Sequence, residues 1–179
     1  MRFSVVLLLM GWGAGAAAAA SGIVAERRET MKSFATAART ISDMFAGKQP
    51  YDSGRFKAAA ELIGQKSGPA LKAEFPAGSS GEGSRAKPEI FTEWSQFALR
   101  ADQLALLADG LAKAADRSPH EIGRDMRMKT AMPMGGTLLA SRIKPLTETE
   151  ISSLPAEHVF HLMIEQCTAC HAKFRTADE

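Results

Sequence analysis

The chain has 179 residues, which is enough for one domain with a hydrophobic core and too few for two domains of ordinary size. Hydrophobic residues make up 45% and charged residues 23%, as is usual for globular proteins. With 22 basic and 20 acidic side chains the formal net charge is +2, which excludes the strongly basic composition of a nucleic-acid-binding protein. The chain has 2 cysteines, both in one short motif near the C-terminus, so a disulfide-stapled fold is also excluded.

Residues 1–20 have the features of a secretory signal peptide. Arg2 precedes an apolar run that ends at Trp12, and a stretch of Gly and Ala then closes on three alanines. We expect cleavage after Ala20, which removes Arg2 and leaves a mature domain of residues 21–179 with a net charge of about +1. The alternative is an uncleaved anchor, for which the apolar run is barely long enough. The mature chain is expected to be exported to the periplasm without a membrane span.

The rest of the chain is predicted to be all-α. Apolar residues recur at three- and four-residue spacing over 23–46, 53–73, 88–115 and 155–175, whereas the two-residue alternation of strands is absent. The Ser67-Gly68-Pro69 sequence is expected to bend or interrupt the second helix. Four amphipathic helices in one small domain most simply pack as an antiparallel four-helix bundle.

The helix ends are also marked in the sequence. Gly47 is a plausible C-cap for the first helix, and Pro50 prevents its continuation. Pro88 and Pro155 are placed to open the third and last helices. The segment 75–87 is rich in Gly and Ser and is predicted to be a loop.

An insertion at 116–154 separates the third and last helices and is too long for a plain connection. Ser118-Pro119-His120-Glu121 forms a capping box, which predicts a short helix over 119–131. A further turn of helix is expected near 147–152. The insertion contains a cluster of methionines that would either supply a rival metal ligand or pack as a lid: Met126, Met128, Met132 and Met134.

The chemistry is concentrated in Cys167-Thr168-Ala169-Cys170-His171, the C-x-x-C-H signature of covalent haem attachment. On a helix, Cys167 and Cys170 stand three residues apart, so their thiols can form thioethers with the two vinyl groups of one haem. His171 follows one turn after Cys167, and its imidazole can reach the iron as an axial ligand. The motif therefore predicts one covalently attached haem c near the C-terminus.

Two other interpretations of the motif are weaker. A thioredoxin-like dithiol normally opens a helix after a strand, whereas this pair lies late in a C-terminal helix. A structural zinc site needs a fourth ligand, and His158 and His161 are rotated away from His171 around the helix. No carboxylate pair, Ser/His/Asp set or phosphate-binding loop is visible, so the protein is not expected to be an enzyme.

A haem motif at the C-terminal end of a four-helix bundle resembles the class II c-type cytochromes, the cytochrome c′ family. Residues 27–32 (RRETMK) are similar to the signature of that family's first helix, and 75–79 and 85–91 are similar to its loop and the start of its third helix. Phe174 and Arg175, after His171, match an aromatic and a basic residue common there. The insertion departs from the family pattern.

The resemblance implies that Met31 lies over the distal face of the haem, opposite His171. A Met thioether can ligate iron, which gives a six-coordinate His/Met centre suited to electron transfer, or it can only pack. Arg27 and Arg28, one turn away, are candidates for contact with a haem propionate. Aromatic residues that would line the haem, or simply belong to the core, are Phe34, Phe91, Trp94 and Phe174.

Two functions follow from these residues. The first is a periplasmic mono-haem electron carrier with His171 and Met31 as axial ligands, which exchanges electrons with redox partner proteins. The alternative is a five-coordinate member of the family that binds NO or CO. Members of the family often pair through their first two helices, so a homodimer is also expected.

Overall fold

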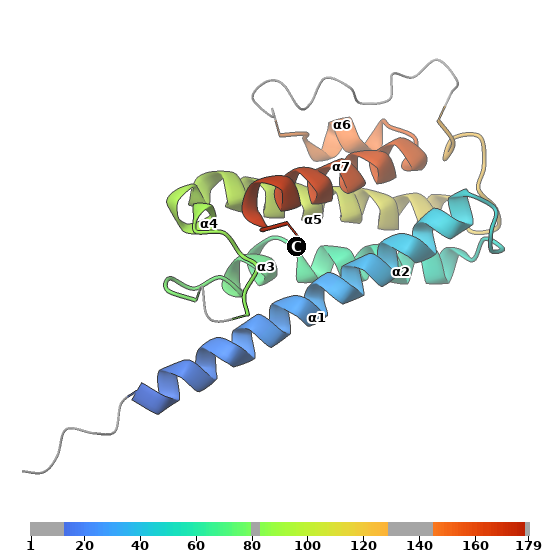
Figure 1. The fold of residues 1–179 in the computed structure, drawn as a ribbon. Coiled ribbons are helices and arrows are strands. Elements are labelled where there is room, and N and C mark those ends of the chain that lie inside the picture. Colours follow the sequence, from blue (N-terminus) through green and yellow to red (C-terminus); the bar gives the residue numbers. More distant parts are fainter. Residues whose placement is uncertain (1–12, 80–82, 129–144, 178–179) are drawn as a thin grey trace, which may run out of the picture.

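The computed structural model describes residues 13–79, 83–128 and 145–177, and four long helices of this part form an antiparallel bundle (Figure 1). Packing runs from α1 to α2, from α2 to α5 and from α5 to α7. The amino-terminal part of α1 extends beyond the other helices (Figure 1). The helices are α1 Gly13–Phe45, α2 Ser53–Lys66, α3 Pro69–Ala73, α4 Glu89–Thr92, α5 Trp94–Arg117, α6 Glu148–Ser152 and α7 Ala156–Phe174.

The marked helix ends are confirmed. Helix α1 ends at Phe45, and Gly47 adopts a φ of 70°, a left-handed conformation that favours glycine. Helix α2 begins after Asp52, whose side chain accepts a hydrogen bond from the backbone of Arg55. Gly68, with a φ of 55°, then separates α2 from α3, which explains the interruption expected there.

The predicted third helix is divided in two. Glu93 has a φ of −118° and a ψ of 39°, so the chain leaves the helical conformation between α4 and α5. This break lets α4 turn toward α7, which it contacts, and buries Ile90 at 2% exposure. The Glu93 carboxylate accepts a hydrogen bond of 2.5 Å from Nζ of Lys173 in α7. The break therefore coincides with contacts that α4 and Glu93 make with α7. Hydrophobic periodicity in the sequence does not encode such contacts with a distant helix.

The helix expected over 119–131 is wrong where the structure describes it, because residues 118–128 form bends and a turn at 124–126 instead of a helix. Ser118 does not open a new helix but ends α5: its N–H bonds the carbonyl of Ala115, and its own carbonyl accepts from Tyr51. The helical turn expected near 147–152 is confirmed as α6, with a complete capping box between Thr147 and Glu150.

The described part of the insertion is tied to the bundle. Met126 is 2% exposed and belongs to the main core, so this methionine packs rather than lying free to bind iron. The Met128 N–H donates to Glu157, and Nη1 of Arg127 donates to the carbonyl of Phe45 at 2.6 Å. Met132 and Met134 lie outside the described residues.

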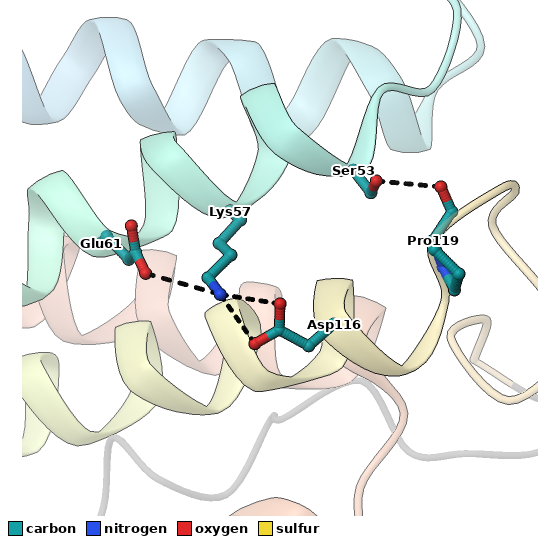
Figure 2. A network of polar contacts seen from close by, with 5 residues as sticks. All are labelled: Ser53, Lys57, Glu61, Asp116 and Pro119. Carbon is teal, nitrogen blue, oxygen red and sulfur yellow. Dashed lines mark hydrogen bonds and ion pairs between the residues drawn. The ribbon is translucent and has the colours of Figure 1, made fainter.

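Polar contacts join the start of α2 to the end of α5 (Figure 2). Nζ of Lys57 lies 2.7 Å from Asp116 and 3.9 Å from Glu61, and Ser53 donates to the carbonyl of Pro119. Early α2 residues therefore meet late α5 residues, as an antiparallel pair requires. These groups are exposed, so water screens each ion pair, and the core provides most of the stability.

Two apolar clusters fill the bundle. The main core lies among α1, α2, α5 and α7, and Ile41, Phe56 and Leu107 in it are fully buried. A smaller cluster, which includes Phe75, Phe97 and Phe174, lies near the last turn of α7. Within the described part of the chain, no helix combines the length and the apolar composition needed to cross a bilayer.

Gly110 allows α6 to pack against α5. A Cβ atom at this position would clash with Cγ2 of Ile151, a stiff β-branched side chain that is 2% exposed. We expect Gly110→Ala to lower the free energy of unfolding by about 1–2 kcal/mol, because overpacking outweighs the gain in helix propensity.

Urea denaturation followed by circular dichroism measures this change. Gly64→Ala is the matched control, because its Cβ would meet Ala108 at an ordinary 3.6 Å. That variant should be as stable as the wild type or slightly more stable. Equal destabilisation by both variants would contradict the packing explanation.

Candidate haem site

The C-x-x-C-H motif lies in the last two turns of α7. Cys170 and His171 line a cavity to which Met31 of α1 also contributes, so the structure brings the predicted proximal and distal residues to one site. Cys167 is half-buried one turn earlier and packs against the main core, and it is not among the residues that line the cavity. Both thiols are free.

The cavity has a volume of about 490 Å³, within the range of cofactor sites in proteins. One wall comes from α1, through Val24, Met31 and Ala35. Other apolar side chains that line it come from α3, α4, α5, α7 and the neighbouring loops: Leu71, Phe75, Ala86, Ile90, Phe97 and Phe174.

Backbone pairing holds the end of α7 beside the loop that precedes α4. Ala86 and Arg175 form an isolated antiparallel bridge. The Lys87 N–H donates to the carbonyl of Phe174 at 2.9 Å, and the Thr176 N–H donates to Arg85 at the same distance. Residues 83–86 therefore line the cavity beside His171. The sequence did not predict this role. The loop has no apolar periodicity that would mark residues 83–86 as part of a cavity wall.

Arg27 lines the cavity, but its guanidinium is already held by protein. Nε donates to the carbonyl of Glu74 at 2.6 Å, and the terminal nitrogens donate to the carbonyl and hydroxyl of Ser79. The guanidinium also stacks over the Phe75 ring, 4.0 Å from its centroid. Burial lowers the pKa of Arg27 from its ordinary value, yet arginine stays charged at neutral pH. Arg27 fixes the 74–79 segment against α1.

Arg28 is the freer of the two arginines. It is exposed, lines the cavity, and donates one hydrogen bond of 2.6 Å to the carbonyl of Gly83. A guanidinium has five N–H donors, so most of its donors remain available to an anionic group in the cavity. Of the two predicted propionate contacts, the structure therefore favours Arg28.

The predicted aromatic residues separate into two groups. Phe174 is buried and lines the cavity. Phe34 is buried in the main core, Phe91 packs against the smaller cluster, and Trp94 is 39% exposed; none of these three lines the cavity as described. Helical periodicity marks a buried position but does not distinguish a core contact from a cavity wall.

The electrostatics of the thiols disfavour a dithiol redox pair. Burial raises the pKa of Cys167 and raises that of Cys170 to about 11. Redox-active C-x-x-C pairs instead have a lowered thiol pKa, usually at the start of a helix. The motif here ends α7, where the helix dipole also disfavours a thiolate.

The imidazole of His171 is suited to bind a metal. Burial, with a smaller contribution from Arg175, lowers its pKa below the ordinary value. A lowered pKa favours the neutral imidazole, which keeps a lone pair for coordination. The described residues include no group of three or more His, Cys, Asp or Glu side chains that could hold a metal ion, which gives the zinc interpretation no support.

The remaining histidines lie elsewhere. His120 and His161 are exposed, and His158 is half-buried with no hydrogen-bond partner for Nδ1. None of the three lines the cavity. A largely apolar cavity with an imidazole and a thiol at its wall fits a covalently attached haem. The thiol can form a thioether with the haem, and the imidazole can ligate its iron.

Comparisons with known proteins identify a family for this chain and a shared fold. The cytochrome c′ family model matches residues 22–133, a stretch that includes Met31 and ends before the haem motif. No match was found among the curated proteins.

Solved structures of low sequence identity share the fold. Cytochrome c prime from Shewanella frigidimarina is 16% identical, with a TM-score of 0.61 over 88% of this chain and 97% of its own. Cytochrome c′ from Thermochromatium tepidum is 19% identical, with a TM-score of 0.60 over 87% and 95%. The nitric oxide complex of the L16A mutant of cytochrome c prime from Alcaligenes xylosoxidans is 21% identical, with a TM-score of 0.60 over 89% and 97%.

The helical bundle and the family match together confirm the resemblance and the fold predicted from the sequence. The chain belongs to the cytochrome c′ family of c-type cytochromes, whose members carry one covalently attached haem c.

Proposed function

We propose that the protein holds its haem through Cys167 and Cys170, with His171 as the axial ligand, and binds NO or CO on the opposite face. The observation that carries this proposal is the apolar α1 wall of the cavity, formed by Val24, Met31 and Ala35 across from the end of α7. An apolar wall offers little to a charged or strongly polar ligand and admits a small uncharged gas. Bound haem supplies an iron centre that can take such a ligand or exchange one electron.

The residues of the chain have separate tasks in this proposal. The two cysteines anchor the cofactor, and the neutral imidazole of His171 supplies the lone pair on one face. Arg28 offers guanidinium donors to a propionate, while Arg27 holds the 74–79 segment in place. Met31 sets how much space remains on the face opposite His171.

The similar structures support gas binding. Two of them are nitric oxide complexes of mutants of cytochrome c prime from Alcaligenes xylosoxidans, each 21% identical to this chain with a TM-score of 0.60. They share the fold of this chain and are complexes with NO, which supports the gas-binding proposal. This is the alternative that the sequence left open, and the comparisons favour it over His/Met electron transfer.

A second candidate function rests on Met31 itself. Its thioether can coordinate haem iron, and the side chain is half-buried at the wall of the same cavity as His171. If its sulfur occupies the sixth position, the protein is a low-spin electron carrier, as the sequence first suggested.

Visible spectra of the reduced protein, with and without CO, separate the two functions. For the gas-binding function we expect a broad high-spin spectrum that shifts on addition of CO. A sharp, split α band unchanged by CO would overturn it and leave the His/Met carrier. Absence of a Soret band would overturn haem attachment and both functions with it.

Export and assembly complete the proposal. We propose that residues 1–20 direct the chain to the periplasm, the compartment of this family, and are removed; residues 1–12 lie outside the described part. N-terminal sequencing of the secreted protein should begin at Ser21. One similar structure is titled a cytochrome c′ with ligand-controlled dimer dissociation, which supports testing a homodimer by analytical ultracentrifugation with and without CO.

A further inference from the structure

Two polar side chains next to Met31 on α1 are hydrogen-bonded to the segment that follows α3. The Thr30 hydroxyl donates to Oε1 of Glu74 at 2.7 Å, and Thr30 is only 1% exposed. Arg27, one turn earlier, donates to the carbonyl of Glu74 and to the carbonyl and hydroxyl of Ser79. These bonds of Thr30 and Arg27 to Glu74 and Ser79 are called the α1 latch.

The α1 latch holds a turn of helix that borders the cavity. Helix α1 packs chiefly against α2, which ends at Lys66. The turn with Met31 lies level with that end, because Glu29, Lys32 and Lys66 line one groove between the two helices. On its other side the turn faces the haem cavity. The latch therefore supplies a restraint that helix packing alone does not give at this turn.

Glu74 occupies an unfavourable place for a carboxylate. Its Oε2 is buried and accepts no hydrogen bond from the described residues. Burial, with a smaller contribution from Glu26, raises the pKa of Glu74 above its ordinary value. The hydrogen bond from Thr30 and the charges of Lys66 and Arg27 oppose this rise. A buried oxygen without a partner costs free energy, so Glu74 is poorly placed to serve stability alone.

We infer that Glu74 is a positioning residue, which holds the turn of α1 with Met31 at the haem cavity through its bond to Thr30. Glu74 directly precedes Phe75, which lines the same cavity. The latch thus joins two walls of one site and restricts movement of Met31 away from the face opposite His171. A hydrogen bond to a charged acceptor is stronger than a neutral one, which suits this task. The inference rests on the proposed function, because the restraint on Met31 sets the space for a gas.

Variants of Thr30 separate the hydrogen bond from the volume of the side chain. Thr30→Val keeps the shape and removes the hydroxyl, whereas Thr30→Ser keeps the hydroxyl. Glu74→Ala removes the acceptor. Tyr51→Phe is the matched control, because it removes one hydrogen bond of 2.8 Å, from the Tyr51 hydroxyl to the carbonyl of Ser118. Neither partner of that bond lines the cavity.

Stopped-flow mixing of the reduced, haem-loaded full chain with CO measures access to the site. Thr30→Val and Glu74→Ala should each raise the rate of CO association at least about threefold. The double variant should be no faster than the faster single variant, because both changes remove the same bond. Thr30→Ser and Tyr51→Phe should stay within about 1.5-fold of the wild type. An increase in Tyr51→Phe equal to that in Thr30→Val would overturn the inference, as would additive effects in the double variant.

Amide hydrogen exchange measures the same restraint without a gas. In the haem-loaded chain, the backbone amides of residues 28–34 should exchange at least about threefold faster in Thr30→Val and Glu74→Ala, because this turn opens more often. Thr30→Ser and Tyr51→Phe should exchange there as the wild type does. Wild-type exchange in both latch variants would overturn the inference. A wild type that does not bind CO would contradict the proposed function instead, and the exchange rates would still decide whether Glu74 holds this turn.

Discussion

Replacing Cys167 and Cys170 together with alanine should abolish covalent haem attachment. The described part of the chain contains no other thiol, so no thioether can form in the double variant. Each single replacement should leave one thioether and sharply reduce the yield of haem-loaded protein. Acid–acetone extraction measures the result: haem should stay with the wild-type protein and leave the double variant completely.

Thr168→Ala is the matched control for this experiment. Thr168 lies between the cysteines, is exposed, and donates its hydroxyl to the carbonyl of Ile164 within the same helix. Its loss should leave attachment unchanged, because it removes neither a thiol nor the imidazole. Haem that is freely extracted from the wild-type protein would show that the attachment proposal is wrong.

Replacing Met31 with alanine should raise the rate of CO association by at least about tenfold, or about 1.4 kcal/mol in the barrier. Met31 is half-buried and lines the cavity, so truncation enlarges the space on the face opposite His171. The bundle should persist, with a loss of about 2 kcal/mol, the low end for deletion of a buried Met side chain. Stopped-flow mixing of the reduced variant with CO measures the rate.

Met31→Leu separates packing from ligation. Leucine nearly preserves the volume of methionine but has no lone pair. For the gas-binding function, this variant should keep the wild-type spin state and CO rate. A change from low spin to high spin in Met31→Leu would establish the thioether as an axial ligand and favour the electron carrier. An unchanged CO rate in Met31→Ala would show that Met31 does not limit access to the haem.

Local features of the sequence determined the four-helix bundle and the haem motif. Gly47, the Gly68-Pro69 pair and Pro155 act on their own backbone, so they mark helix ends without knowledge of the rest of the fold. The C-x-x-C-H spacing likewise places its thiols and imidazole within one turn of a single helix.

Only the tertiary structure decided features that join distant segments. Arg27 was a candidate for propionate contact, and its hydrogen bonds to residues 47 and 52 positions away show that it fixes a loop. The capping box at Ser118 has the local signature of a helix start, yet Tyr51 and the end of α5 use its backbone groups instead. A hydrogen bond or charge cluster between remote residues depends on the path of the whole chain, which local sequence patterns do not encode.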